Sequence, residues 1–204
     1  MDWLKEFESY SSKIGDRLTI YQLVANKYNI KRALYPGSHI DISPSMVIED
    51  VTYIDNFKGT IKFFKEINDI NKYINGKKSY QEKCRIAFIG TDYNNNLEIA
   101  KVDMIISQYA GFVGQATKKY LKEDGILLCN DSHGDATLAN LDEDYTLIAI
   151  IDHHQKLSTN QLEKYFVCKN NMQIDKDKVL TSMKGPKYKL QATHYIFKLQ
   201  RKLK

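Results

Sequence analysis

Apolar residues follow two different patterns along this chain, a helical period first and short continuous runs afterwards. The change from one pattern to the other predicts the elements. In the first thirty residues they recur every three to four positions, which predicts helices over residues 2–12 and 16–28. From residue 32 onward, short apolar runs alternate with further helical segments. The runs predict strands at residues 32–36, 51–54, 85–89, 102–106, 126–129 and 145–151. The segments between them predict helices at residues 44–49, 58–65 and 111–121, and the second helix either continues or restarts through residue 74.

The order of these elements predicts an α/β fold. The last four of the six runs are almost continuously apolar, as expected of strands that are covered on both faces. Strands separated by helices predict a mainly parallel, doubly wound sheet with right-handed crossovers. The run at residues 194–199 has no helix directly before it, so we expect it to pair antiparallel with the strand at 145–151. We expect a single domain over residues 1–204, with helices in 1–29 and the sheet in 30–204.

One further helix is indicated after the sixth strand. Ser158 and Gln161 have the spacing of a capping box, which predicts a helix that continues through Tyr165.

The strongest turn signal lies directly after the first predicted strand, at Pro36-Gly37. Ser43-Pro44 then suits the start of a helix. Asp55 follows Gly37 by eighteen residues, at the end of the second predicted strand. A glycine turn and an acid at this separation are typical of nucleotide sites in doubly wound sheets. An ordinary strand-to-helix turn with a surface acid remains the alternative.

Polar residues follow each of the first five predicted strands. They are Tyr35-Pro36-Gly37-Ser38, Asp55, Thr91-Asp92, Ser107-Gln108-Tyr109 and Asn130-Asp131-Ser132-His133. Because the carboxyl ends of parallel strands meet at one edge of a sheet, we expect these residues to converge on a ligand site.

Six strands alternating with helices, followed by an antiparallel strand, resemble the Rossmann-like fold of class I S-adenosylmethionine-dependent methyltransferases. The resemblance covers residues 30–200 and implies S-adenosylmethionine as the cofactor. It implies that the loop of Tyr35, Pro36, Gly37 and Ser38 lies against the methionine part of the cofactor. It also implies that Asp55 binds the ribose hydroxyls, that Asp92 lies near the adenine amino group, and that Ser107, Gln108 and Tyr109 lie beside the transferred methyl group.

The chain also departs from the family pattern. The family loop is acid-x-Gly-x-Gly-x-Gly, whereas this loop has one glycine, a proline before it and no acid leading into it. No Asn-Pro-Pro-Tyr or Asp-Pro-Pro-Tyr motif follows the fourth strand, so nucleic-acid amino-methyltransferases of that type are not indicated. A NAD-type dehydrogenase is disfavoured because G-x-G-x-x-G is absent. The alternative to a methyltransferase is a non-catalytic protein of the same fold that binds a nucleotide or nucleic acid.

Asp131 and His133 are the candidate catalytic residues, since methyl transfer to a protonated nucleophile requires a base. The same loop also suits helix capping by Asp131, Ser132 and Asp135. A metal site built from His133, Asp135, His153 and His154 is disfavoured, because neighbouring histidines on a strand point to opposite faces. The methyl acceptor, a small molecule or a macromolecule, is not identified by the sequence, and neither is the oligomeric state.

Charge and cysteine content add two expectations. The net charge is +5, and seven basic residues lie in 184–204, a segment without acidic residues. The rest of the chain has 23 basic and 25 acidic residues, so the excess positive charge belongs to the C-terminus. This basic C-terminus is a candidate surface for nucleic acid, and a solvated face is the simpler alternative. Three cysteines without a pairing motif, no apolar run long enough for a membrane span and no signal-peptide pattern at the N-terminus predict a cytoplasmic protein that does not enter membranes.

Overall fold

The computed structural model describes residues 2–169 and 171–201. The chain forms two compact units, Met1–Leu97 and Glu98–Lys204. The expectation of a single domain stays a prediction. Among the described residues, every helix is too short or too polar to cross a lipid bilayer.

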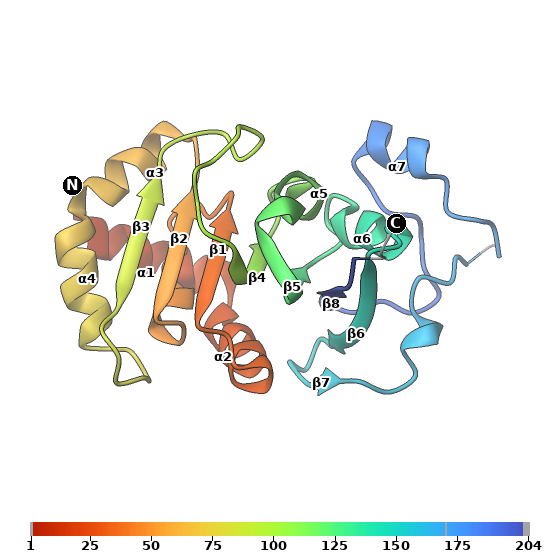
Figure 1. Cartoon of the computed structure of the whole chain (residues 1–204), viewed down its shortest axis with the longest axis horizontal. Helices are drawn as coiled ribbons and strands as arrows, with labels where there is room; N and C mark the ends of the chain where they lie inside the picture. Colours follow the sequence, from red (N-terminus) through yellow and green to blue (C-terminus); the bar gives the residue numbers. More distant parts are fainter. Residues whose placement is uncertain (1, 170, 202–204) are drawn as a thin grey trace. The chain divides into compact units, whose positions relative to one another are not determined.

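The first unit contains three parallel strands in the order β3-β2-β1 (Figure 1). They are β1 (Arg32–Pro36), β2 (Asp50–Ile54) and β3 (Arg85–Ile89). Their helices are α1 (Trp3–Ile14), α2 (Arg17–Tyr28), η1 (Ser43–Met46), α3 (Lys58–Phe63), η2 (Phe64–Glu66) and α4 (Ile67–Asn75). All three strands begin and end within one residue of the expected positions.

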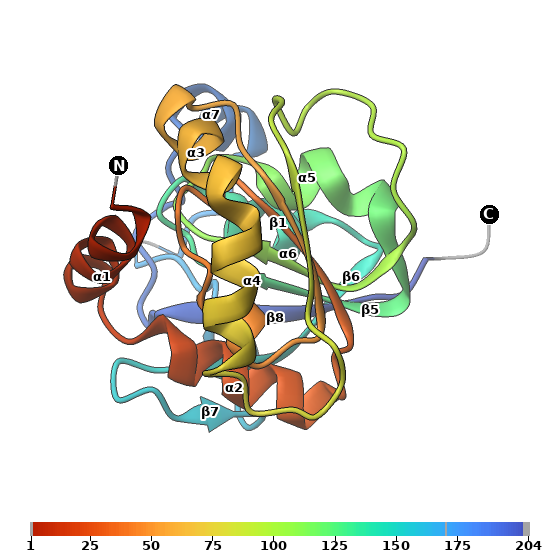
Figure 2. The same ribbon diagram turned by 90° about the vertical axis from the view of Figure 1, so that its left-hand side faces the viewer.

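Aromatic side chains hold the N-terminal helix α1 in the first unit. Trp3 packs edge-on against Phe63 of α3 and Tyr73 of α4, and Phe7 also packs against Tyr73. In Figure 2, α4 lies in front of the strands of this unit. Asp2 and Asp16 accept hydrogen bonds from main-chain N–H groups in the first turns of α1 and α2, so both helix starts are capped.

The second unit contains five strands in the order β4-β5-β8-β6-β7. They are β4 (Val102–Ser107), β5 (Leu121–Cys129), β6 (Tyr145–Ile151), β7 (Leu157–Ser158) and β8 (His194–Leu199). The helices are α5 (Val113–Thr117), η3 (Lys118–Tyr120), α6 (Asp135–Leu141), η4 (Leu162–Lys164) and α7 (Lys176–Ser182). β4 and β5 are parallel, and the other neighbouring pairs are antiparallel.

The antiparallel pairing of β8 with β6 is confirmed, with His194 opposite Ile151 and Leu199 opposite Tyr145. β8 also pairs antiparallel with β5, so it lies inside this sheet rather than at its edge. Its burial is consistent with that position, because five of its six residues are buried. The chain therefore forms an α/β fold in which parallel strands are followed by an antiparallel C-terminal strand, as expected.

Two expectations about the elements were wrong. The capping-box helix is not formed: Ser158 belongs to β7 and pairs with Ile150, and only the short η4 follows. The reason is a tight turn at Asp152–Lys156, closed by the Asp152 N–H to the Lys156 carbonyl at 3.1 Å, which returns the chain along β6. β3 is not covered on both faces, because it lies at the edge of its sheet and none of its residues is buried.

The helix α7 was not expected from the sequence, and β5 begins at Leu121 rather than at residue 126. All three cysteines are free and buried, where an unpaired cysteine packs as a small apolar side chain.

Candidate functional site

The loop after β1 is a tight turn that is anchored to the end of β2. Gly37 and His39 both have left-handed backbone conformations, with φ of 63° and 48°. The Gly37 N–H donates to the carbonyl of Ile54 at 2.8 Å. Such a conformation is rare for a histidine and is maintained only where the surroundings fix it. The loop therefore adopts a defined shape with a single glycine. Gly37 occupies the first of its two left-handed positions, and His39 occupies the second.

Asp55 is the residue that fixes this loop from β2. One carboxylate oxygen accepts the His39 N–H at 2.8 Å, and the other accepts the Phe57 N–H at 2.8 Å. A carboxylate can accept about four hydrogen bonds, so each oxygen keeps a lone pair for a ligand. Asp55 is half-buried. It is thus a preorganised acceptor at the end of β2, and its binding of the ribose hydroxyls stays a prediction.

Asp92 lies at the same rim of the first unit. Its carboxylate accepts from Asn56, the neighbour of Asp55, at 3.2 Å, and from the backbone and side chain of Asn94. The structure thus brings the expected residues Gly37, Asp55 and Asp92 together at the carboxyl end of β1, β2 and β3.

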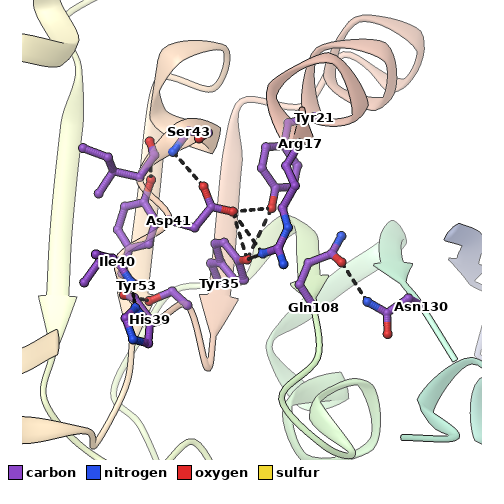
Figure 3. A network of polar contacts seen from close by, with 12 residues as sticks. Arg17, Tyr21, Tyr35, His39, Ile40, Asp41, Ser43, Tyr53, Gln108 and Asn130 are labelled. Carbon is purple, nitrogen blue, oxygen red and sulfur yellow. Dashed lines mark hydrogen bonds and ion pairs between the residues drawn. The ribbon is translucent and has the colours of Figure 1, made fainter. Parts of the chain in front are cut away.

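A buried carboxylate connects the residues that follow this turn to α2 and β1, and the sequence analysis missed it. Asp41 is fully buried and accepts from Tyr21 Oη at 2.8 Å, Tyr35 Oη at 3.2 Å and Arg17 Nη1 at 3.4 Å (Figure 3). Its other oxygen accepts the Ser43 N–H at 3.2 Å, which also fixes the start of η1. Tyr35, expected to contact the cofactor, therefore directs its side chain into this internal network. An acid between two isoleucines was the sequence signal for a buried, paired carboxylate.

The network has a clear electrostatic signature. Burial raises the pKa of Tyr21 and Tyr35 well above 10, and the Asp41 carboxylate raises both further. Burial alone would lower the pKa of Arg17, but Tyr35, Tyr21 and Asp41 outweigh it and raise that pKa. Arg17 is therefore a fixed cation, and the two phenols stay protonated as donors to Asp41.

In the second unit, Asp135 connects the end of β4 to α5 and α6. Its carboxylate accepts from Ser107 Oγ at 2.6 Å and from the Gly114 N–H at 2.9 Å. A Cβ on Gly114 would lie 3.1 Å from both carboxylate oxygens, so the glycine permits this close approach. Burial raises the pKa of Asp135 to about 6, against the opposing effect of the Ser107 and Gly114 hydrogen bonds. Asp135, which the sequence analysis assigned to helix capping, is thus the hydrogen-bond partner of Ser107.

The Gln108 amide is oriented by a chain of hydrogen bonds in the second unit. The Ser132 N–H donates to Asn130 Oδ1 at 3.1 Å, so Asn130 Nδ2 is the atom that donates to Gln108 Oε1 at 2.8 Å (Figure 3). His194 Nε2 lies 3.1 Å from the same oxygen and must be its second donor. Gln108 Nε2 is buried and has no hydrogen-bond partner among the described residues. His194, which the sequence analysis placed only in a strand, therefore helps to orient Gln108.

Asp131 caps α6 with both carboxylate oxygens. They accept from the Thr137 N–H and from Thr137 Oγ1, each at 2.8 Å. Burial raises the pKa of Asp131, and the Thr137 hydrogen bonds oppose that rise. His133 is half-exposed, with Nδ1 at 3.0 Å from Ser132 Oγ. The capping role expected as an alternative for Asp131 is present, and the catalytic roles stay predictions.

The basic C-terminus is partly neutralised within the second unit. Lys198 pairs with Asp124 and Arg201 with Glu123, at 3.5 and 3.2 Å. Lys202 and Lys204, which belong to the same expected nucleic-acid surface, lie outside the described residues. No group of three metal-ligating side chains that could hold an ion occurs among residues 2–169 and 171–201.

We predict that Asp41→Asn lowers the free energy of unfolding by about 3 kcal/mol, because it leaves Arg17 without its buried counter-charge. Chemical denaturation measures this change. Asp69→Asn is the matched control, since Asp69 forms an exposed pair with Lys72 in the same unit and should cost about 0.5 kcal/mol or less. Equal effects of the two substitutions would contradict the proposed importance of the Asp41 network.

Asp135 should make the protein less stable as the pH rises from about 4 to about 6. The folded protein binds this proton more tightly than the unfolded chain, whose pKa is near 3.8. The unfavourable contribution is therefore absent below pH 3.8 and complete above about pH 6, at about 3 kcal/mol for a shift of about two units. Asp135→Asn removes this titration, so the stability difference between wild type and variant should change by that amount over the interval. A difference that does not vary with pH would refute the raised pKa.

Comparison with known proteins identifies the fold. No family model matches the sequence, and no curated protein sequence matches it. Among solved structures, the plantazolicin methyltransferase BpumL in complex with SAH matches with a TM-score of 0.53 and 12% identity, over 98% of this chain and 89% of that chain. A methyltransferase from Geobacter sulfurreducens matches with a TM-score of 0.51 and 11% identity, over 74% of this chain and 83% of that one.

The N-methyltransferase NodS from Bradyrhizobium japonicum, in complex with S-adenosyl-L-homocysteine, is also similar, with a TM-score of 0.43 and 15% identity. The match covers 62% of this chain and 65% of NodS, so the chain spans slightly less than two thirds of that relative. From the two matches with the higher TM-scores we conclude that this chain has the Rossmann-like fold of class I S-adenosylmethionine-dependent methyltransferases.

Proposed function

We propose that this protein is an S-adenosylmethionine-dependent methyltransferase. The observation that carries the proposal is the contact between the left-handed turn after β1 and the acid after β2. The His39 nitrogen lies 2.8 Å from Asp55 Oδ2, so the turn and the acid proposed to bind the ribose form one preformed element. This element occurs in a chain whose fold is that of methyltransferases, two of which are described with the product S-adenosyl-L-homocysteine.

The residues of the first unit fit the cofactor in part. Asp55 has free lone pairs for the two ribose hydroxyls, and the backbone of Pro36, Gly37 and Ser38 is the proposed contact for the methionine part. Asp92 keeps acceptor capacity near the same rim for the adenine amino group. Tyr35 contributes only its backbone, because its hydroxyl is engaged with Asp41.

Bound S-adenosylmethionine would supply an activated methyl group that is transferred in an in-line displacement. The protein's own contribution is to position the nucleophile and, where that nucleophile is protonated, to remove a proton. We propose that Ser107 and Gln108 lie beside the methyl group of the bound cofactor and that Gln108 also orients the acceptor. The unpartnered Nε2 of Gln108 can donate to an acceptor oxygen, because His194 and Asn130 occupy its Oε1.

We propose His133 as the base and Asp131 as the residue that positions its loop. His133 is half-exposed, and histidine is the side chain that most often serves as a general base. Asp131 already accepts two hydrogen bonds from Thr137 and caps α6, so its removal should act on the loop first.

The methyl acceptor is a small molecule or a macromolecule, and the basic C-terminus keeps nucleic acid among the candidates. The alternative is a protein of this fold that binds a nucleotide or nucleic acid without catalysis. Titration calorimetry with S-adenosylmethionine separates the two, because only the first requires binding of this cofactor.

Asp55→Ala should weaken binding of S-adenosylmethionine by about 10–100-fold, since it removes charge-assisted hydrogen bonds to the ribose. Calorimetry measures the affinity, and the melting temperature shows whether the variant is folded. Asp55→Asn keeps one acceptor oxygen and should have a smaller effect. Unchanged affinity in a folded Asp55→Ala variant would remove this assignment, and absence of binding by the unmodified protein would favour the non-catalytic alternative.

His133→Ala should lower turnover by about 10²–10⁴-fold while leaving cofactor affinity near normal, as expected when a general base is removed. Turnover is measured as S-adenosylhomocysteine formed with a mixed pool of small-molecule and RNA acceptors. Asp131→Ala should instead lower stability by about 0.5–2 kcal/mol through the lost cap. Normal turnover of a folded His133→Ala variant would show that His133 is not the base.

A further inference from the structure

A cavity of about 620 Å³ in the first unit is not used by the proposed methyl transfer. It lies between α1, the start of α3 and the loop after β1, and this volume is within the range of small-molecule pockets. Three lysines and three aromatic rings line it: Lys5, Lys13, Lys62, Tyr10, His39 and Phe57. The combination of ammonium groups and stacked rings suits a ligand that is both anionic and planar.

The rings form a stack with one open end. Tyr10 and His39 are nearly parallel, with centroids 4.7 Å apart and an interplanar angle of 13°. His39 and Phe57 are also stacked, with centroids 5.8 Å apart and an angle of 25°. Phe57 is 58% exposed, and no other large apolar side chain among residues 2–97 is exposed. An aromatic ring exposed at the end of a stack is a platform on which nucleobases pack.

The backbone fixes Phe57 in this position. Its N–H donates to Asp55 Oδ1 at 2.8 Å. Its ring lies against Gly59, where a Cβ would come within 2.6 Å of the Phe57 Cε1 atom. His39 is fixed in the same way, because its N–H donates to Asp55 Oδ2. The stack is therefore a preformed surface, which reduces the entropy lost on binding.

The charges beside the stack match a phosphate group. Lys5 pairs with Asp2 at 3.2 Å, whereas Lys13 and Lys62 have no ion pair among residues 2–97. Glu6 is the acidic residue of the lining, so the lining has a net charge of +2 with His39 neutral. A phosphate monoester carries nearly two negative charges at neutral pH. Lysine is also a common phosphate ligand in proteins.

We propose that this cavity binds a nucleoside phosphate, with the base stacked on Phe57 and the phosphate held by Lys13 and Lys62. The ligand is a free nucleotide or the phosphorylated end of an RNA strand, which share this chemistry. The site goes beyond the proposed methyl transfer, because the described cofactor residues Gly37, Asp55 and Asp92 do not line the cavity.

The test is calorimetric titration of the full chain at low salt with ADP, adenosine, a 5′-phosphorylated pentauridylate and its unphosphorylated form. ADP should bind more tightly than adenosine, and its affinity should fall with added salt. Lys13→Ala combined with Lys62→Ala should weaken ADP about tenfold or more, flatten the salt dependence and leave adenosine unchanged. Phe57→Ala should weaken ADP and adenosine alike, by about tenfold.

Lys27→Ala, on the last turn of α2 and outside the cavity, is the matched control and should leave ADP affinity unchanged. Tighter binding of the phosphorylated pentauridylate than of ADP would identify a strand end as the ligand, and the reverse would identify a free nucleotide. Absence of ADP and RNA binding at millimolar concentration, or an equal loss with Lys27→Ala, would overturn the proposal. Displacement of ADP by S-adenosylhomocysteine would also overturn it, because the cavity would then be part of the cofactor site. Failure here leaves S-adenosylmethionine binding unaffected, so the two proposals fail separately.

Discussion

The rim of the first unit depends on one buried negative charge. Asp41 is fully buried near the loop after β1, and its carboxylate is paired there with Arg17 and with two tyrosine hydroxyls. The three donors come from α2 and β1, so this carboxylate joins the N-terminal helices to the first strand. It also accepts from Ser43 and thereby sets where η1 begins. Loss of this charge would free the segment that contains Gly37 and His39.

This arrangement offers a physical explanation for a loop with one glycine where the family pattern has three. Glycines allow left-handed turns and close approach without fixing the backbone. Here the left-handed conformation of His39 is stabilised instead by the hydrogen bond from its N–H to Asp55. The Asp41 network fixes the chain on both sides of His39, because Asp41 binds Tyr35 before it and follows it by two residues. The Ile40 N–H also donates to His39 Nδ1 at 2.8 Å, which fixes the ring of that residue. Specific hydrogen bonds thus stabilise a conformation that additional glycines would otherwise allow, and the shape of the turn depends on the Asp55 and His39 side chains.

The strands and their order of appearance could be predicted because apolar runs and turn residues are local signals. The antiparallel direction of β8 could also be predicted, since no crossover helix precedes it. Ser158 could not be assigned correctly, because strand pairing with Ile150 overrides a local capping pattern. The edge position of β3 depends on the strand order, which no local pattern encodes. For the site, Asp55 and Asp92 were visible as acids at strand ends, whereas Asp41, Asp135 and His194 each have a partner that is distant in sequence, at 20, 28 and 86 positions.

Asp55 links the two proposed ligand sites through its two oxygens. One hydrogen bond fixes the backbone of His39 and the other that of Phe57, and the rings of these two residues stack on each other in the lysine-lined cavity. The lone pairs that remain on the same carboxylate are those proposed to bind the ribose. Asp55 is therefore common to both proposals: it is the proposed ligand of the ribose, and it holds the backbone of two of the residues whose rings line the cavity.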